Sequence, residues 1–264
     1  MQMRVYLCAL AKNEQPYINE WVAHYVKLGF DKIYIYDNDD LGVKPSYKFI
    51  DEKYNEHIVV IDIRGQHYNR IQGKMYADFY KRHSKDFDWC LFCDIDEFLM
   101  GIDNIKKFLS KGSFTTTQQI RIKWKLFGDD NLIERDMNKG VVETFRQEIV
   151  IPLSFQGKTI VKGNLNNVAF NSVHFANYTT NKMLPSVLPS GKKCNSGVYI
   201  TEDYSKETVF INHYMTKSLS EFVAQKINRG DAVFSNRQIK LDYYWRLNKK
   251  TPEKEKYLKD MGLE

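Results

Sequence analysis

The chain is poor in cysteine and has no long apolar run. Its cysteines are Cys8, Cys90, Cys93 and Cys194, and so few thiols in a chain of this length predict small buried residues in a reducing compartment, not a disulfide framework. Cys90 and Cys93 form a CxxC pair, but it lies within a strand pattern and no second pair completes a zinc site. No stretch approaches 18 uncharged apolar residues, so we expect no transmembrane helix.

Signals for export and for nucleic acid are also lacking. The N-terminus, MQMRVYLCALAKNEQ, reaches Lys, Asn and Glu too early for a signal peptide, which predicts a cytoplasmic protein. The 39 basic and 33 acidic residues leave a net charge of +6, with neither a dense basic stripe nor a nucleic-acid module. We therefore expect no nucleic-acid partner, although the positive balance favours an anionic ligand or surface.

A basic segment near the end of the chain, NRQIKLDYYWRLNKK (236–250), suits an anionic membrane surface. It makes peripheral association with the inner face of a membrane a possible property, for a bacterial cytoplasmic enzyme or for a chain trimmed of its anchor. A solvated helix face is the alternative interpretation of the same residues.

What the chain does contain is enough apolar material for a sizeable core. Hydrophobic residues make up 43% and aromatic residues 14% of the sequence, which excludes a disordered chain. The length of 264 residues suits one large domain with an appendage. We expect a main domain over residues 1–215, and a helical extension over 216–264 that packs on it.

The first half of the chain alternates between strand and helix patterns. Short apolar or alternating runs at 4–10, 31–37, 57–63 and 87–96 predict strands, and three- and four-residue spacings predict helices between Pro16 and Gly29 and over 69–84. Such alternation indicates an α/β fold with a mixed, mostly parallel sheet and flanking helices. Because ligands of these sheets bind beyond the carboxyl ends of the strands, the loops AKNE, DNDD and DIDE should share one edge.

The second half of the sequence has looser patterns. A long strand is expected over 118–128, a short helix over 141–149, and two helices near 218–229 and 236–248, followed by a charged tail. Further strands are expected in KTIVKG (158–163), VAFNSVHFA (168–176) and TVFINHY (208–214).

The segment CLFCDIDEFLM (90–100) carries the strongest chemical signal. On an extended strand end residues i and i+2 point the same way, so Asp94 and Asp96 can present two carboxylates to one point while Ile95 turns to the core. Hard divalent cations such as Mg²⁺ and Mn²⁺ bind oxygen ligands and keep positions open for phosphate oxygens. Solvated carboxylates at a strand end are the alternative.

These segments together carry a resemblance to a known group of enzymes. LAKNEQPYINEWVAHYVKLGFDKIYIYDND, CDIDEFL, WKLFG and INHYMTKSLSEF resemble GT-A fold glycosyltransferases, of the family-two-like and family-ninety-two-like group, from about residue 7 to 230. The resemblance implies that Asn13 and Glu14 lie by the nucleotide, and that Asp37 with Asn38 contacts the base or ribose side. It also implies that Asp94 and Asp96 hold the Mn²⁺ or Mg²⁺ ion that bridges the donor diphosphate.

Other polar residues are candidates for the same site. His213 precedes a helix start and could complete the metal shell, as a late histidine often does in GT-A enzymes. His174 is a second candidate, and Lys217 with Lys158 or Lys162 could offset phosphate charge. The alternatives are hydrogen-bonded loop histidines and solvated lysines.

The catalytic base has no clean sequence signal. An inverting transferase needs a carboxylate that accepts the proton of the acceptor hydroxyl, and the family-two pattern for it is missing here. The candidates are Asp129, Asp130 and Glu97, and a retaining mechanism stays open. Trp124 and Phe127 could stack on a sugar face, with core packing as the alternative.

The combined prediction is a metal-dependent glycosyltransferase. It would move a sugar from a nucleotide-sugar donor, UDP-linked in our expectation, to a glycan or lipid-linked saccharide acceptor, for example in cell-surface polysaccharide biosynthesis. A nucleotidyltransferase would use similar carboxylates but usually has a Gly-rich phosphate loop, and AKNEQP has no glycine. A non-catalytic nucleotide- or glycan-binding protein on the same fold is the third interpretation.

Overall fold

The structure is a computed structural model and describes residues 2–66, 68, 70–151, 155–228 and 237–263. It divides into two compact units. The first comprises Met1–Trp124 and Ile151–Asn212, and the second comprises Lys125–Val150 and His213–Glu264. The second unit thus takes in residues 125–150 as well as the end of the chain. The division into a domain over 1–215 and an extension over 216–264 stays a prediction.

Four parallel strands form one side of the sheet in the first unit, in the order β3-β2-β1-β4. They are β1 (Val5–Ala11), β2 (Lys32–Asp37), β3 (Ile58–Asp62) and β4 (Trp89–Phe92). In the register, Ala11 lies opposite Asp37 and Cys8 lies opposite Phe92, so the carboxyl ends of these strands meet at one edge. This confirms the predicted parallel arrangement.

The sheet continues with antiparallel pairs, so it is mixed. Beyond β4 the order is β8-β6-β12-β5, with β8 antiparallel to both β4 and β6. These strands are β5 (Glu97–Met100), β6 (Gln119–Phe127), β8 (Gly157–Lys162) and β12 (Phe210–His213), and β11 (Ser186–Val187) pairs with β6 in parallel. A mixed α/β fold with flanking helices is therefore confirmed.

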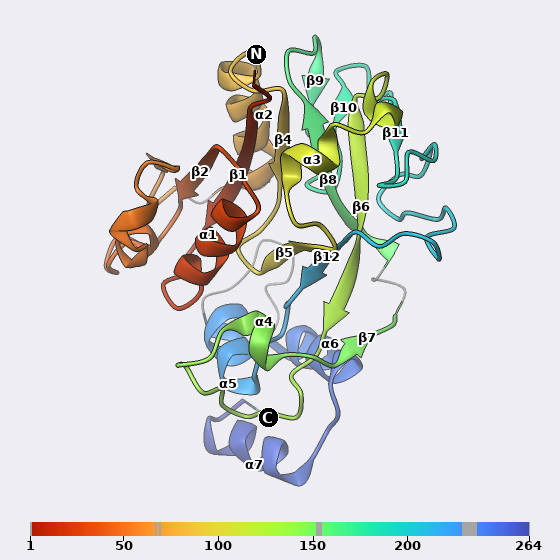
Figure 1. The fold of residues 1–264 in the computed structure, drawn as a ribbon. Coiled ribbons are helices and arrows are strands. Elements are labelled where there is room, and N and C mark those ends of the chain that lie inside the picture. Colours follow the sequence, from red (N-terminus) through yellow and green to blue (C-terminus); the bar gives the residue numbers. More distant parts are fainter. Residues whose placement is uncertain (1, 67, 69, 152–154, 229–236, 264) are drawn as a thin grey trace. The chain divides into compact units, whose positions relative to one another are not determined.

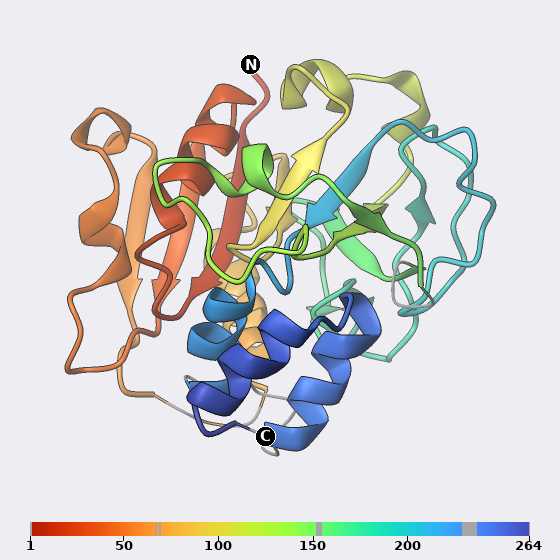
Figure 2. The same ribbon diagram turned by 90° about the horizontal axis from the view of Figure 1, so that it is seen from below.

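Two helices cover the two faces of the parallel strands (Figures 1 and 2). Helix α2 (Ile71–His83) packs aromatic side chains such as Phe79 against Tyr34 and Phe92. Helix α1 (Ile18–Lys27) anchors the start of β5, because Trp21 Nε1 and Tyr25 Oη each donate a hydrogen bond of 3.0 Å to the Glu97 carbonyl. The core thereby fixes the backbone next to the DIDE loop.

Shorter elements complete the first unit. They are α3 (Ile105–Leu109), the 3₁₀ turns η1 (Ser46–Phe49), η2 (Glu52–Tyr54) and η3 (Gly112–Phe114), and the β9 (Val168–Ala169) and β10 (Asn177–Tyr178) pair. The strand predicted over 168–176 is reduced to its first two residues. Strand β5 and helix α3 were not predicted, and the strand predicted over 87–96 extends past the end of β4 at Phe92 into the turn before β5.

The second unit is mostly helical. It contains α4 (Val141–Thr144), β7 (Glu148–Ile149), α5 (Leu219–Phe222), the π-helical segment η5 (Val223–Asn228), α6 (Arg237–Leu247) and α7 (Pro252–Asp260). Strand β7 pairs with the last residues of β6. Phe222, Tyr244 and Leu258 form the core of the helical part. Residues 229–236, which the predicted helices include in part, lie outside the described residues.

The prediction of a charged tail after residue 248 is wrong in one respect, because residues 252–260 of this segment fold as helix α7. Thr251 caps the helix by accepting a hydrogen bond from the Lys254 backbone N–H, and Pro252 occupies the first turn. A threonine followed by proline is a helix start signal that outweighs the high charge of this segment. Of the helices described, none is long and apolar enough to cross a membrane.

Candidate active site at the carboxyl edge of the sheet

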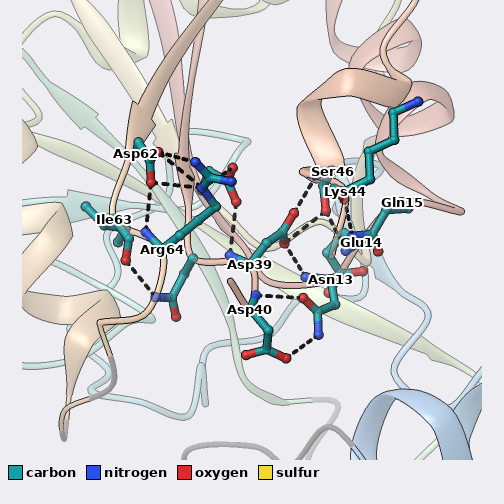
Figure 3. Close-up of polar contacts among 12 residues, drawn as sticks. Asn13, Glu14, Gln15, Asp39, Asp40, Lys44, Ser46, Asp62, Ile63 and Arg64 are labelled. Atoms are coloured by element: carbon teal, nitrogen blue, oxygen red, sulfur yellow. Dashed lines mark hydrogen bonds and ion pairs between the residues drawn. The ribbon is translucent and has the colours of Figure 1, made fainter. Parts of the chain in front are cut away.

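The loops after β1 and β2 are joined by hydrogen bonds (Figure 3). Asn13 has a positive φ of 51°, and its side-chain Nδ2 donates to Asp40 Oδ2 at 2.7 Å while its Oδ1 accepts from the Asp40 backbone N–H at 3.1 Å. The Asn13 backbone N–H donates to Asp39. The prediction that AKNE and DNDD converge on one edge is therefore confirmed.

Asp39 connects these loops through buried hydrogen bonds, a role that the sequence analysis did not predict. Its carboxylate is fully buried and accepts hydrogen bonds from the Ser46 backbone and from Ser46 Oγ, the latter at 3.0 Å. Ser46 Oγ in turn accepts from the Glu14 backbone N–H at 2.8 Å. The only signal in the sequence was the density of acids in DNDD, which does not tell which acid points inward.

Asp37 ends β2 in a buried position. It accepts a hydrogen bond from the Asp39 backbone N–H at 3.0 Å, and Arg64 Nε lies 3.8 Å from its Oδ2. Burial raises the pKa of Asp37 to about 6, against the opposing effects of that hydrogen bond and of Arg64. Asn38 holds the next loop, because its Nδ2 donates to the carbonyls of Ile63 at 3.2 Å and Gln66 at 2.7 Å.

The DIDE segment is a tight turn and not a strand end. Strand β4 ends at Phe92 and β5 begins at Glu97. The Asp94 backbone N–H donates to Glu97 Oε2 at 2.9 Å, and the Glu97 backbone N–H donates to the Asp94 carbonyl at 3.2 Å. Ile95 is buried as expected, while the side chain of Asp94 is 32% exposed. The acidic turn, Asp94–Glu97, therefore lies at the edge that β1 and β2 share.

A buried lysine lies against this turn. Lys158 Nζ donates to Asp94 Oδ2 at 2.9 Å and lies 3.6 Å from Glu97 Oε2, and its side chain has no exposed surface. Burial alone would lower the pKa of Lys158, but the carboxylates of Asp94 and Glu97 outweigh it and raise the pKa. Burial likewise raises the pKa of Glu97 well above its usual value, although Lys158 opposes this. Lys158 therefore carries the positive charge in this cluster.

The strand register decides which lysine of KTIVKG reaches the acidic turn. Because β8 is antiparallel to β4, Thr159 lies opposite Phe92 and Lys162 lies opposite Trp89, at the far end of β4. Lys162 Nζ donates to the Thr115 carbonyl at 3.2 Å there. Of these two lysines the structure thus places Lys158, and not Lys162, beside the acidic turn, since four strand residues span about 13 Å.

Two further side chains belong to this cluster. Gln72, in the first turn of α2, donates through Nε2 to Asp94 Oδ1 and to Tyr76 Oη, the latter at 2.9 Å. No sequence signal marked it. His174 Nδ1 lies 3.1 Å from the Gly157 carbonyl. Burial, reinforced by the positive charge of Lys158, lowers the pKa of His174 to about 4, so this imidazole is neutral at pH 7.

The other predicted base candidates have structural partners in the second unit. Asp129 is buried and accepts hydrogen bonds from Lys254 Nζ and Tyr244 Oη. Asp130 has a φ of 49° and accepts from the backbone N–H groups of residues 146–147 at 2.8 and 2.9 Å. These contacts give both aspartates structural partners, and the role of Asp129 or Asp130 as the base stays a prediction.

His213 and Lys217 also lie in the second unit, and both are buried. Their roles at the metal and the phosphates stay predictions. Within the described part of the chain, no group of three or more His, Cys, Asp and Glu side chains is arranged to hold a metal ion.

The two aromatic candidates for sugar stacking have packing partners. Trp124 is buried with its ring centroid 5.2 Å from that of His174, and Phe127 stacks on Tyr214 at 4.9 Å. These contacts favour core packing, the alternative that the sequence left open.

Comparison with known proteins found one weak similarity in sequence and one partial likeness in structure. No family profile matches the chain. Over 178 residues, or 64% of the chain, it is 26% identical to a glycosyltransferase family 92 protein from Ricinus communis, and the match covers 30% of that protein. The chain thus spans less than a third of the length of this relative, to which it is weakly similar.

One solved structure with a partial likeness is a mannosyltransferase from Pyrobaculum calidifontis in complex with GDP-Man and Mn²⁺. The likeness has a TM-score of 0.35 and 13% sequence identity, over 46% of this chain and 36% of that one.

Proposed function

We propose that this protein is a GT-A fold glycosyltransferase that moves a sugar from a nucleotide-sugar donor to a saccharide acceptor. The observation that carries the proposal is the acidic turn, Asp94–Glu97, at the sheet edge where the Asn13 and Asp37 loops also end. Ligands of parallel α/β sheets bind at that edge. The weak similarity to a family 92 glycosyltransferase supports the same class of reaction.

In this proposal the nucleoside lies over the loops after β1 and β2. Asn13 and Glu14 belong to the first loop (Figure 3). Asp37 is the last residue of β2, and Asn38 follows it. The hydrogen bonds to Asp39 and Ser46 keep these loops in one arrangement before the donor binds. Such preorganisation lowers the entropy cost of binding a flexible nucleotide.

The donor set of the acidic turn fits Mn²⁺ or Mg²⁺. Nucleotide enzymes usually hold such ions through one or two carboxylates together with substrate phosphates and water, so a three-residue protein cage is not needed. Asp94 and Asp96 supply hard oxygen ligands, and each Asp94 oxygen that accepts from Gln72 or Lys158 has a second lone pair. A metal bound there would act as a Lewis acid for the departing diphosphate.

Glu97 acts in this proposal as a positioning residue. It is fully buried, it accepts a hydrogen bond from the Asp94 backbone N–H at 2.9 Å, and it lies 3.6 Å from Lys158 Nζ. A group so placed orients the turn and does not reach an acceptor hydroxyl, so the proton acceptor of the reaction is a different group.

The finer parts of the proposal rest on the sequence. They are a UDP-linked donor, a glycan or lipid-linked saccharide acceptor in cell-surface polysaccharide biosynthesis, and a cytoplasmic location at the inner face of a membrane. His213 as a third metal ligand and Lys217 as a phosphate contact belong to the same group of proposals.

A nucleotide-sugar screen tests the reaction class. Purified protein is incubated with UDP-, GDP- and dTDP-sugars and Mn²⁺ or Mg²⁺, and slow hydrolysis of the donor is followed. We expect release of a nucleoside diphosphate from one donor class, lost in Asp94→Ala because the metal ligand is gone, with an unchanged circular dichroism spectrum.

The control is Asp88→Ala, a substitution of an acid at the opposite end of β4, which should leave hydrolysis unchanged. Release of pyrophosphate from nucleotide substrates would favour a nucleotidyltransferase instead. Equal donor binding by wild type and Asp94→Ala, with and without chelator, would remove the acidic turn from the function.

A further inference from the structure

The Lys158 ammonium group is held inside the acidic turn. Lysine is almost never fully buried unless it is paired, and the side chain of Lys158 has no exposed surface. Its partners are two of the three carboxylates of that turn, with Asp94 Oδ2 at 2.9 Å and Glu97 Oε2 at 3.6 Å. A fixed positive charge is therefore part of the site in which the proposed function puts a divalent cation.

The position of Lys158 in the fold leaves it little freedom to withdraw. It lies on β8, where it pairs with Ile122 of β6, and its neighbours Gly157 and Thr159 are buried. The ammonium group contacts the inner side of Asp94, while 32% of the Asp94 side chain stays open to solvent. A cation that arrives from solvent thus meets a carboxylate whose charge is already partly neutralised.

The charge of Lys158 has different effects on cation binding in the absence and in the presence of a diphosphate. A divalent cation on Asp94 lies within a few ångströms of the ammonium group, because the two share one carboxylate, and their repulsion is strong in a partly buried site. A diphosphate brought by the donor adds negative charge on the open side of the cation. The repulsion between the cation and Lys158 is then offset by attraction of both to the phosphates.

We propose that Lys158 couples metal binding to donor binding. It weakens the affinity of Asp94 for a divalent cation alone, so that the site retains the cation tightly only together with a nucleoside diphosphate. The inference rests on the proposed function and adds that the cation and the nucleotide bind cooperatively. By linkage, the factor by which the nucleotide tightens cation binding equals the factor by which the cation tightens nucleotide binding.

The test is a titration of Mn²⁺ in which electron paramagnetic resonance reports the unbound ion. Wild type, Lys158→Met and Lys158→Arg are compared without nucleotide, and then with UDP or GDP after correction for the Mn²⁺–nucleotide complex in solution. We expect Lys158→Met to bind Mn²⁺ in the absence of nucleotide at least about tenfold more tightly than wild type, which corresponds to one pK unit of charge interaction. The factor by which nucleotide raises the Mn²⁺ affinity should shrink by the same amount. Lys158→Arg keeps the charge and should behave as wild type.

Two further variants control for folding and for surface charge. Lys162→Met removes a lysine from the far end of the same strand and should leave Mn²⁺ affinity unchanged. Because loss of Lys158 leaves the buried Glu97 without its positive partner, the double variant Lys158→Met/Glu97→Gln replaces the pair by neutral groups of similar size. It should show the same gain in Mn²⁺ affinity while melting cooperatively.

The outcomes separate the inference from the proposed function. Equal Mn²⁺ affinities of wild type and both Lys158→Met proteins, with donor hydrolysis intact in wild type, overturn the coupling alone. Donor hydrolysis that persists in chelator, with Mn²⁺ bound by none of the variants, overturns the coupling and the metal site together. Failure to bind or hydrolyse any nucleotide-sugar overturns the proposed function itself.

Discussion

At the scale of single residues, the site is organised by buried charges that sequence alone does not distinguish from exposed ones. Asp94 accepts hydrogen bonds from Gln72 and Lys158, and Asp39 accepts from Asn13 and Ser46. In each case a polar group that is costly to bury is satisfied by partners outside its own turn, at least seven residues away in the chain. The open part of Asp94 is what remains for a ligand.

A pH-dependent prediction concerns Asp37. Its pKa in the folded protein is about 6, above the value of 3.8 of an unperturbed aspartate, so the folded state holds a proton more tightly than the unfolded state. The Asp37 carboxyl therefore contributes most to the stability of the folded state below pH 4, and this contribution is lost as the pH rises through about 6. We expect Asp37→Asn to be more stable than wild type by about 1 to 2 kcal/mol at pH 8, with the difference vanishing near pH 4.

Urea unfolding of the two proteins at both pH values measures this difference. Asp62→Asn serves as the control, because that carboxylate lies at the end of β3 and its pKa is lowered by Arg64. If the difference in free energy of unfolding between wild type and Asp37→Asn is the same at pH 4 and at pH 8, the raised pKa of Asp37 is contradicted.

At the scale of elements, strand β8 is the part that brings the site together. Its antiparallel register with β4 delivers Lys158 to the acidic turn, and Gly157 before it lets β6 approach closely. A Cβ atom built on Gly157 would lie 1.9 Å from the carbonyl oxygen of Ile122. No rearrangement of a flexible side chain can relieve that contact, since the neighbour is backbone.

We therefore expect Gly157→Ala to be strongly destabilising, by about 3 kcal/mol or more, through displacement of β8 from β6. The matched control is Gly112→Ala, because a Cβ atom at Gly112 meets nothing within 4 Å. Thermal melting of both variants gives the comparison. A Gly157→Ala protein that melts like wild type would mean that β6 and β8 pair less closely than described.

At the scale of the whole molecule, two separated chain segments build the second unit. Residues 125–150 and 213–264 are joined by buried contacts, among them Arg135 Nε to Glu221 Oε1 at 3.0 Å and Lys254 Nζ to Asp129. Breaking a buried ion pair by removal of one partner leaves an uncompensated charge and is costly. The C-terminal helices thus share buried contacts with residues 125–150 of the same unit.

Truncation after residue 212 tests this organisation. It would remove Glu221 from Arg135 and Lys254 from Asp129, and would expose the apolar side of residues 125–150, so we expect aggregation or loss of a cooperative thermal transition. The control is removal of residues 261–264 only, which lie beyond α7. A soluble 1–212 protein that melts cooperatively would show that the segment 125–150 is stable by itself.

Much of the fold followed from periodicity, because burial on one face imposes it locally. The ends of β1 and β2, the start of α2 near Ile71 and the length of β6 agree with the apolar patterns to within a few residues. The turn at Asp94–Glu97 could not be found this way, since WCLFC and FLM are apolar on both sides of it. The site residues Asp39 and Gln72 were missed because no local pattern records which polar side chain turns inward.

The sequence by itself determined the alternation of strands and helices, and with it the single edge where AKNE, DNDD and DIDE end. This follows because hydrophobic spacing selects each element and parallel crossovers align the strand ends. Only the tertiary structure decided that Lys158 and not Lys162 meets Asp94. The two lysines are an even number of residues apart on one strand and so share a face, and only the register with β4 tells them apart.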